Sequence, residues 1–467
     1  MFDSSRKRDH SGPFKWRMPF VFVLFLLSCA SNPKKIAPPA TPVGATQLDN
    51  TLDRYLTALT NHNYMQGSFI ITRGGQPLFE RAYGSLDAKG LYKANTESTY
   101  RIASISKTFT ATMIMQLIDE GQLSLETSIE RWFPSVPNAE KITVDLLLRH
   151  RSGLYNIYAD TDEAWLYEPI SREELIEKIV FYGAYSDPDT ERDYNNSNYM
   201  LLGYLIETLD QQSLNDALQQ RISNKIGAVR TETGQPIQVD QNEAKSLGYL
   251  NDWVETEHVN LTTCGGAGGF VSHPRDICRF ANKLFNGDLL SESSLTYMKD
   301  MEAGLFSDDN TYYGHAGGMD EFRSNMLFRP TDQTCLAYTT NAYFYKPDAL
   351  VSVLKKASDG EPIVVPTFEK IELTQEQLAV YSGVYKSSER PSHLILQPGE
   401  GVLLIQESES KTFKEDEEHA PLLTESDGVF AFYPYALEIE FRDNEQGPKD
   451  HFILSLGEET FRYKRMR

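Results

Sequence analysis

The chain has 467 residues, a formal net charge of −21 and 40% hydrophobic residues. This length accommodates two or three domains of about 100–200 residues each, and the hydrophobic content excludes global disorder. The acidic balance argues against a nucleic-acid partner, because a phosphate backbone would be repelled.

The N-terminus has the pattern of an export signal. Basic residues at positions 6–17 precede an apolar run at 18–27. The run is shorter than the roughly 20 residues of a membrane-spanning helix, but it fits the core of a signal peptide. It ends in Leu-Leu-Ser-Cys-Ala, which resembles the bacterial lipobox with Cys29 as the lipidated residue. We therefore expect residues 1–28 to be removed. The mature protein would be a lipoprotein of the bacterial cell envelope, held to a membrane only through Cys29. An ordinary signal peptide with a chance cysteine is the alternative.

A folded body follows the leader. Residues 29–48 are rich in proline and alanine and form an extended linker. Helical periodicity begins at Leu52, and two strand-like runs at 68–72 and 77–83 are joined by a Gly-Gly turn. The body therefore opens with a helix and a β-hairpin.

Strand patterns also close this body. The segment 104–226 is mostly helical in its periodicity, and strand patterns return at 322–328 and 334–340 before a helix at 348–356. Strands at both ends of 49–360 indicate one sheet built from both ends of a domain. The predicted fold class is an α/β sheet domain with an inserted all-α subdomain and a cleft between them.

The last part of the chain, 370–467, has a different character. Short strand-like pieces are separated by turns and acidic stretches, at 381–385, 393–396, 402–406, 428–433, 437–441, 451–456 and 460–463. This regular spacing predicts a small all-β domain, folded as a barrel.

The cysteines and histidines give weaker signals. Besides Cys29 the chain has three cysteines, Cys264, Cys278 and Cys335, and none of them forms a CxxC pair. We expect them to be buried free thiols. A bridge between Cys264 and Cys278 is the alternative. No His-Glu-x-x-His motif or metal-spaced cluster occurs in the sequence, so we expect no metal and no cofactor. We assign surface or capping roles to His150, His258 and His273.

The strongest chemical signal is Ser104-x-x-Lys107, which opens an apolar helical run that ends at Gly121. One helical turn separates the two side chains, so they lie on the same side. A serine hydroxyl needs a neighbouring base to become a nucleophile, and a buried lysine serves as one because desolvation disfavours its charged form. Alone, a Ser-x-x-Lys match is weak, but its position at the start of a buried helix strengthens it.

Two further segments carry candidate residues. Tyr194 and Asn196 lie two apart before an apolar helix, and the phenol could relay a proton if nearby positive charge lowered its pKa. The simpler interpretation is that Asn196 or Ser197 caps that helix. His315 lies in a glycine-rich segment before the strand at 322–328, where small residues let a substrate backbone approach.

The conjunction of the three motifs is more specific than any one of them. Ser-x-x-Lys, Tyr-x-Asn and His-x-Gly, in this order, resemble the motifs of the penicillin-recognising serine hydrolases. The similarity is to the class C β-lactamase type with its D-aminopeptidase, carboxylesterase and D-alanyl-D-alanine carboxypeptidase relatives. It covers about 49–356 and includes the glycine-rich stretch at 265–272. Residues after about 370 resemble the lipocalin-like C-terminal domain of some members.

The resemblance implies a mechanism. Ser104 would form an acyl-enzyme, and Lys107 and Tyr194 would share the base and acid duties. Asn196 would hold Lys107 or the substrate amide, and the backbone N–H groups of Ser104 and Gly318 would bind the oxyanion. His315 and Gly317 would line the substrate site.

One departure from the family pattern bears on the substrate. Many members carry Lys-Thr-Gly where this chain has His315-Ala316-Gly317. Histidine is mostly neutral at pH 7, whereas lysine keeps a charge for a substrate carboxylate. We therefore expect a hydrolase of small acyl substrates, namely esters, amides or D-amino-acid peptides. A β-lactamase or D-alanyl-D-alanine carboxypeptidase is the alternative enzyme, and a catalytically silent protein that binds cell-wall or peptide ligands is the alternative of another class. The oligomeric state stays open.

Overall fold

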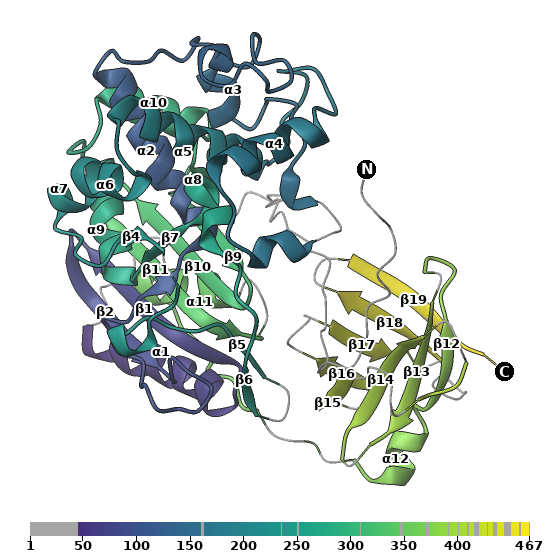
Figure 1. Ribbon diagram of the computed structural model, residues 1–467. Helices are drawn as coiled ribbons and strands as arrows, with labels where there is room; N and C mark the ends of the chain where they lie inside the picture. The colour runs from purple at the N-terminus through teal and green to yellow at the C-terminus, as the bar shows by residue number, and fades with distance from the viewer. Residues whose placement is uncertain are drawn as a thin grey trace.

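The computed structural model describes residues 45–466, apart from gaps at 160–162, 235, 250–251, 309, 346–348, 369–370, 372, 391, 400, 409–410, 415–419, 427, 433–436, 443–449 and 457–458. The predicted signal peptide and Cys29 lie outside the described residues, as does the linker up to residue 44. The described chain forms an α/β body followed by a β-barrel (Figure 1).

The α/β body is built on a six-stranded sheet of order β2-β1-β11-β10-β9-β8. The described strand pairings within it are antiparallel, and they bring β1 (Met65–Arg73) beside β11 (Thr334–Tyr343), so that both ends of the domain meet in one sheet. Every residue of β11 is buried, as expected for a central strand covered on both faces. The other strands are β2 (Gln76–Tyr83), β8 (Phe306–Asp308), β9 (Tyr312–Met319) and β10 (Phe322–Arg329). The predicted fold class is confirmed.

Helices cover both faces of this sheet. The apolar residues of α1 (Ala45–Asn61) and α11 (Ala349–Asp359) pack with one face, and those of α2 (Ser106–Asp119) and α9 (Pro274–Phe285) with the other. Twelve consecutive residues of α2 are buried, so it is a core helix with no solvent face. The inserted subdomain lies above the sheet in Figure 1 and contributes α3 (Val144–Leu148), α4 (Arg172–Tyr182), α5 (Asn196–Asp210), α6 (Leu214–Leu218), α7 (Asn224–Ile226), α8 (Gly265–Gly268) and α10 (Glu292–Asp300).

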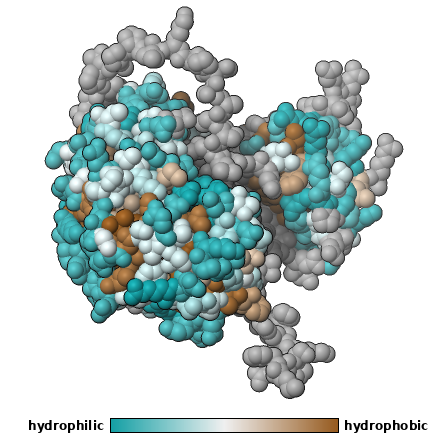
Figure 2. Space-filling view, turned by 90° about the horizontal axis from the view of Figure 1, so that it is seen from above, coloured by the Kyte–Doolittle hydropathy of each residue, from teal (hydrophilic) through white to brown (hydrophobic). Residues whose placement is uncertain are grey.

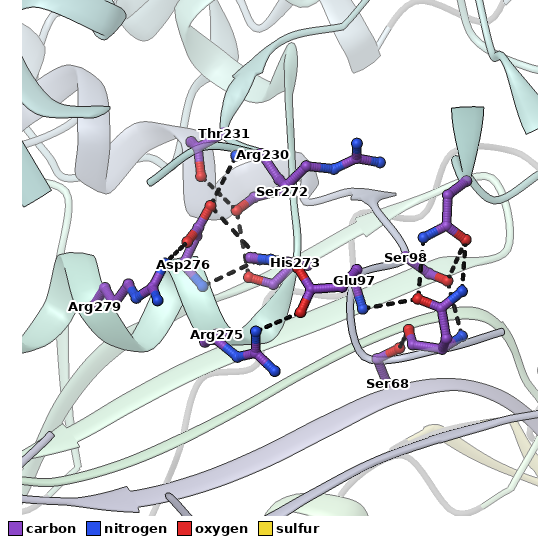
Figure 3. Close-up of polar contacts among 12 residues, drawn as sticks. Ser68, Glu97, Ser98, Arg230, Thr231, Ser272, His273, Arg275, Asp276 and Arg279 are labelled. Atoms are coloured by element: carbon purple, nitrogen blue, oxygen red, sulfur yellow. Dashed lines mark hydrogen bonds and ion pairs between the residues drawn. The ribbon is translucent and has the colours of Figure 1, made fainter. Parts of the chain in front are cut away.

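Two small sheets complete the body. One joins β3 (Tyr100–Arg101), β7 (Phe270–Ser272) and β4 (Glu232–Thr233), and the other is the hairpin of β5 (Leu247–Tyr249) and β6 (Trp253–Glu255). The start of α9 beside β7 is held by a polar network (Figure 3). His273 caps this helix, since its Nδ1 accepts a hydrogen bond from the backbone N–H of Asp276 at 3.2 Å. The capping role of His273 is confirmed.

The C-terminal domain is a closed eight-stranded barrel preceded by the short helix α12 (Gln375–Ala379). Its interior is filled by aromatic rings, among them Tyr385, Phe441 and Phe452. Ala431 of the barrel packs with Leu247 and Phe344 of the α/β body. The strands are β12 (Gly383–Lys386), β13 (His393–Pro398), β14 (Leu403–Ser408), β15 (Ala420–Ser426), β16 (Val429–Phe432), β17 (Leu437–Phe441), β18 (His451–Leu456) and β19 (Glu459–Arg465).

The prediction of buried free thiols holds for Cys264 and is wrong for the other two cysteines. Cys278 of α9 and Cys335 of β11 form a disulfide with a Cα–Cα distance of 5.7 Å, and Cys264 is a buried free thiol. Neither three free thiols nor a Cys264–Cys278 bridge is formed. The pairing arises because α9 packs across the central strand, which joins residues 57 positions apart in the sequence.

The surface is mostly polar where it can be seen. Figure 2 shows a largely hydrophilic face with hydrophobic residues gathered in small patches. Within the part of the chain that the structure describes, no helix combines the length and the apolar character needed to cross a bilayer.

Candidate active site

Ser104 lies in a tight turn between a strand and a helix. Strand β3 ends at Arg101, a 3-10 turn follows at Ala103–Ile105, and α2 begins at Ser106. Ala103 adopts a φ of +45°, which alanine rarely does, so this turn is held by its surroundings rather than by its own preference. Ser104 is 6% exposed and lines a pocket. The sequence expectation of a serine at the entry of a buried helix is met.

Lys107 is fully buried one turn further along. Its Nζ lies 3.1 Å from Oγ of Ser104, 2.8 Å from Oδ1 of Asn196 and 2.7 Å from the carbonyl oxygen of Ala267. The last two atoms only accept hydrogen bonds, so a neutral amine donates to both and turns its lone pair toward Ser104. Burial lowers the pKa of Lys107 to about 7, with Cys264 opposing the shift. The amine therefore has the state and the position of a base.

The partners of Lys107 come from two helices that pack closely. Asn196 is the first residue of α5, and Asn195, rather than Asn196 or Ser197, caps the helix by accepting from the N–H of Ser197 at 2.8 Å. Ala267 lies in α8, whose Gly266 contacts the backbone of α5 so closely that an added Cβ would lie 2.6 Å from a carbonyl oxygen there. Asn196 is thus free of capping duty and holds the lysine.

Tyr194 lies against Lys107, with its ring centroid 4.9 Å from Nζ. Burial raises the pKa of Tyr194, while a hydrogen bond with Ser104 and the charge of Arg192 oppose the rise. The condition set for a relay, a pKa lowered by positive charge, is therefore not met, because desolvation outweighs the charge of Arg192. The phenol stays protonated at neutral pH, which makes it a proton donor rather than a base.

His150 is a site residue for which the sequence predicted only a surface or capping role. It is 2% exposed, and its ring lies 4.6 Å from that of Tyr194 and 5.0 Å from that of Tyr199. Its Nδ1 accepts from the backbone N–H of Asn195 at 3.0 Å, so it orients the segment that carries Tyr194. Its positive φ of 59° marks a turn, but no motif in the sequence connects it to the other residues.

The third motif forms an edge of the main sheet rather than a loop. His315 and Gly317 lie on β9 and face the same side, where an added Cβ on Gly317 would lie 2.3 Å from the carbonyl oxygen of Ile102. Only glycine lets the turn of Ser104 approach this strand so closely. His315 is buried, its Nδ1 lies 2.6 Å from the carbonyl oxygen of Ala316, and burial lowers its pKa to about 3, with Lys107 adding to the shift.

Gly318 offers a backbone N–H at the open edge of the sheet. Met319 and Phe322 flank a two-residue hairpin turn and form a hydrogen-bonded pair. Hydrogen-bonded and non-hydrogen-bonded pairs alternate along an antiparallel ladder, so the next pair, Gly318 and Arg323, is not hydrogen-bonded. The N–H of Gly318 therefore points away from β10. Strand β8 pairs only with residues 312–314 of β9, so it leaves Gly318 uncovered.

A small and largely apolar pocket lies beside the serine. Ser104, Asn196 and Gly318 contribute to it, and its remaining wall is formed by Ala103, Tyr158, Val259, Cys264, Ala267, Gly268 and Met319. The structure thus brings together residues from five separate stretches of the chain. Among the described residues no group of three or more histidine, cysteine or acidic side chains is placed to hold a metal ion.

This fold and site define a serine hydrolase with a Ser-x-x-Lys centre. Residues 52–354 match the family model described as Beta-lactamase, and the chain belongs to this family.

Two curated relatives extend the match. A penicillin-binding protein of Bacillus subtilis (strain 168) is 23% identical over 443 residues, which is 87% of this chain and 97% of that protein. Penicillin-binding protein 4 of Amycolatopsis lactamdurans is 30% identical over 278 residues, covering 55% of this chain and 72% of that one.

Solved structures share the architecture. The D-amino acid amidase of Ochrobactrum anthropi SV3, complexed with D-phenylalanine, superimposes with a TM-score of 0.59 at 23% identity and covers 67% of this chain and 99% of that one. The octameric penicillin-binding protein homologue from Pyrococcus abyssi gives a TM-score of 0.60 at 19% identity, with 90% and 100% covered. At these identities the likeness shows a common fold.

Proposed function

We propose that the protein is an exported serine hydrolase that cleaves ester or amide bonds of small acyl or peptide substrates through an acyl-enzyme on Ser104. The observation that carries this proposal is the buried amine of Lys107. Its Nζ lies 3.1 Å from Ser104 Oγ, and its two other hydrogen bonds go to oxygen acceptors, Oδ1 of Asn196 and the carbonyl oxygen of Ala267. A lysine without a chemical role would gain nothing from this burial, because desolvation penalises its charge.

The proposed reaction begins with acylation. Ser104 Oγ bonds to the substrate carbonyl carbon as its proton passes to Nζ of Lys107, and the carbonyl oxygen becomes an oxyanion held by the N–H groups of Ser104 and Gly318. The tetrahedral intermediate collapses, and the leaving nitrogen or oxygen takes a proton from the phenol of Tyr194. The phenolate then recovers a proton from the ammonium of Lys107, whose Nζ lies 4.9 Å from the centre of the Tyr194 ring, so both groups return to their starting states.

Deacylation uses water as the nucleophile, with Lys107 again as the base. A water molecule loses a proton to neutral Lys107 and attacks the acyl carbon. The bond to Ser104 Oγ breaks, and Oγ recovers its proton from the lysine, so the enzyme returns to its starting state. The overall change is one water consumed for each ester or amide bond cleaved.

The state of His315 favours substrates without a carboxylate at this position. Its pKa of about 3 keeps the imidazole uncharged at neutral pH, so it offers hydrogen bonding and no fixed charge. This supports esters and amides over penicillins or peptides that end in D-alanine. One structure with the same fold is a D-amino acid amidase, so D-amino-acid amides are suitable first substrates to assay.

Export is part of the same proposal. The Cys278–Cys335 disulfide supports an oxidising compartment outside the cytoplasm, where such bridges persist. Lipidation of Cys29 is tested by metabolic labelling with a clickable palmitate analogue. Label is expected on the wild-type protein and none on the Cys29→Ala variant, and equal labelling of both would refute it.

The hydrolase proposal is tested by covalent labelling and turnover. A fluorophosphonate should label the wild-type protein but not Ser104→Ala, while Ser106→Ala, which changes a buried serine two residues away, keeps the label. Turnover of a p-nitrophenyl ester and a D-alanine p-nitroanilide should exceed that of nitrocefin. Saturable binding of peptide ligands without label or turnover would instead establish the silent binding protein.

A further inference from the structure

Two opposite charges are buried behind the pocket, and the proposed reaction does not use them. Nη1 of Arg101 lies 3.9 Å from Oδ2 of Asp320, and each side chain is only 4% exposed. Arg101 ends β3, three residues before Ser104. Asp320 lies in the hairpin turn, two residues after Gly318. The pair therefore joins the segment that carries the nucleophile to the segment that carries the second oxyanion donor.

A third segment is held by the same two side chains. The backbone N–H of Val259 donates to the two carboxylate oxygens of Asp320 at 3.4 and 3.3 Å, and its carbonyl oxygen accepts from Nη1 of Arg101. The backbone of one residue, Val259, is thus bound through both its N–H and its C=O. Val259 lines the pocket, so these contacts fix a wall of the site.

The three segments meet at the pocket. Ser104, Gly318 and Val259 all line it. Ser104 follows Arg101 by three residues, and Gly318 precedes Asp320 by two. Val259 is the residue whose backbone bonds to both charged side chains. The turn of Ser104 is also joined to β10, the second strand of the hairpin, where Ser324 Oγ donates to the carbonyl oxygen of Ile102 at 2.8 Å. The charged pair supplies a second point of attachment, which fixes the angle between the two segments.

Stability alone gives a poor account of this pair. A buried ion pair is often no better than a well-packed apolar pair, because both charges lose their hydration. The buried Nε of Arg101 has no hydrogen-bond partner among the described residues. Arg101 and Asp320 instead contact the backbone of Val259, and Asp320 itself lies in the hairpin turn that follows Gly318. Val259 and Gly318 both line the pocket, so these contacts determine its shape.

We propose that Arg101 and Asp320 are positioning residues that set the separation of the N–H groups of Ser104 and Gly318 and the placement of the Val259 wall. This inference rests on the proposed function of Ser104. An oxyanion hole acts only when both donors meet the developing charge at hydrogen-bond distance, and a displacement of about 1 Å costs about 100-fold in rate. The pair holds that distance from behind the site without contacting the substrate.

The test compares the transition state with the ground state. Asp320→Asn keeps the shape of the side chain and removes its charge. We expect kcat/KM for a p-nitrophenyl ester to fall by about 10- to 100-fold, mostly through kcat. The affinity for phenylboronic acid, which forms a tetrahedral adduct on Ser104, should fall by the same factor. Assays at pH 8.5 keep the carboxylate ionised, because burial raises the pKa of Asp320 to about 7 against the opposing charge of Arg101.

A matched control removes a buried charge far from the pocket. Asp210 lies 2.5 Å from Arg221, and each side chain is 8% exposed. Asp210→Asn should lower the midpoint of urea unfolding while kcat/KM and boronate affinity stay within twofold of the wild type. If Asp320→Asn does not fold, Arg101→Lys keeps the positive charge without the planar fork that reaches two partners, and it should lower both quantities by about 10-fold.

The result that overturns the inference is an Asp320→Asn or Arg101→Lys variant that folds and keeps both quantities within twofold of the wild type. A wild-type protein that neither turns over the ester nor binds the boronate would instead refute the proposed function. A loss of unfolding midpoint without loss of boronate affinity would show that the pair only stabilises the fold, and would also overturn the inference.

Discussion

Replacing Lys107 with methionine should abolish turnover and change stability in a way that depends on pH. Burial lowers the pKa of Lys107 from 10.5 to about 7. Between pH 7 and pH 10.5 the lysine is therefore protonated in the unfolded chain and neutral in the folded protein. Below pH 7 it is protonated in both states, but its burial in the folded protein costs free energy of folding. With about 1.4 kcal/mol per pKa unit, this destabilises the wild type by about 5 kcal/mol at pH 6 and about 2 kcal/mol at pH 9.

The substitution also has a cost that does not vary with pH. Methionine leaves Oδ1 of Asn196 and the carbonyl oxygen of Ala267 without their donor, at about 1–3 kcal/mol each. This cost is the same at every pH, so it cancels when the stability difference between wild type and variant at one pH is subtracted from that at another. The wild type should therefore gain about 3 kcal/mol relative to Lys107→Met between pH 6 and pH 9. The sign follows from the lowered pKa, since stability rises with pH wherever the unfolded state binds more protons.

Urea unfolding followed by tryptophan fluorescence measures this difference. All four tryptophans precede residue 260, and those among the described residues lie in the α/β body: Trp132, Trp165 and Trp253. The signal therefore reports the domain that contains the lysine. A difference between wild type and variant that stays constant within 1 kcal/mol from pH 6 to pH 9 would mean that Lys107 is charged in the folded protein, and the assignment of the base would fall.

Three further outcomes are expected. The value of kcat/KM for a neutral ester should rise with pH through about 7 as Lys107 loses its proton, and a profile flat from pH 5.5 to 8.5 would contradict this. Cys278→Ala, which opens the bridge to Cys335 across 57 residues, should lower the free energy of unfolding by about 4 kcal/mol, measured by the urea midpoint. Gly317→Ala should lower kcat by about 100-fold, because its Cβ would lie 2.3 Å from the carbonyl oxygen of Ile102. Wild-type turnover in that variant would refute the close-approach argument.

Much of the fold could be predicted because local patterns carried it. The strand patterns at 322–328 and 334–340 became β10 and β11, and the helical periodicity after Ser104 became α2. Strand β15 escaped prediction, since its sequence contains a proline and lies beside an acidic stretch, both of which disfavour strands in sequence reasoning. The glycine-rich segment around His315 was expected to precede a strand, and it is itself strand β9, because it pairs with β10.

The site was predictable only as far as its motifs reach. Ser104, Lys107, Tyr194 and Asn196 belong to motifs, and the structure brings them together within hydrogen-bond or ring contact. His150 belongs to no motif, and its role arises from packing against Tyr194 in the folded chain. The Cys278–Cys335 bridge and the buried pair behind the pocket join distant segments in the same way, so one-dimensional spacing could not reveal them.

The division of labour between acid and base also required the structure. From the sequence, the lysine and the phenol were interchangeable as proton carriers. In the fold both side chains lose hydration, but desolvation moves their pKa values in opposite directions, because it disfavours ammonium in one case and phenolate in the other. Lys107 thereby becomes the group that accepts a proton near pH 7, and Tyr194 becomes the one that keeps and donates it. A single physical cause, exclusion of water from one crevice, assigns both roles and keeps His315 uncharged beside them.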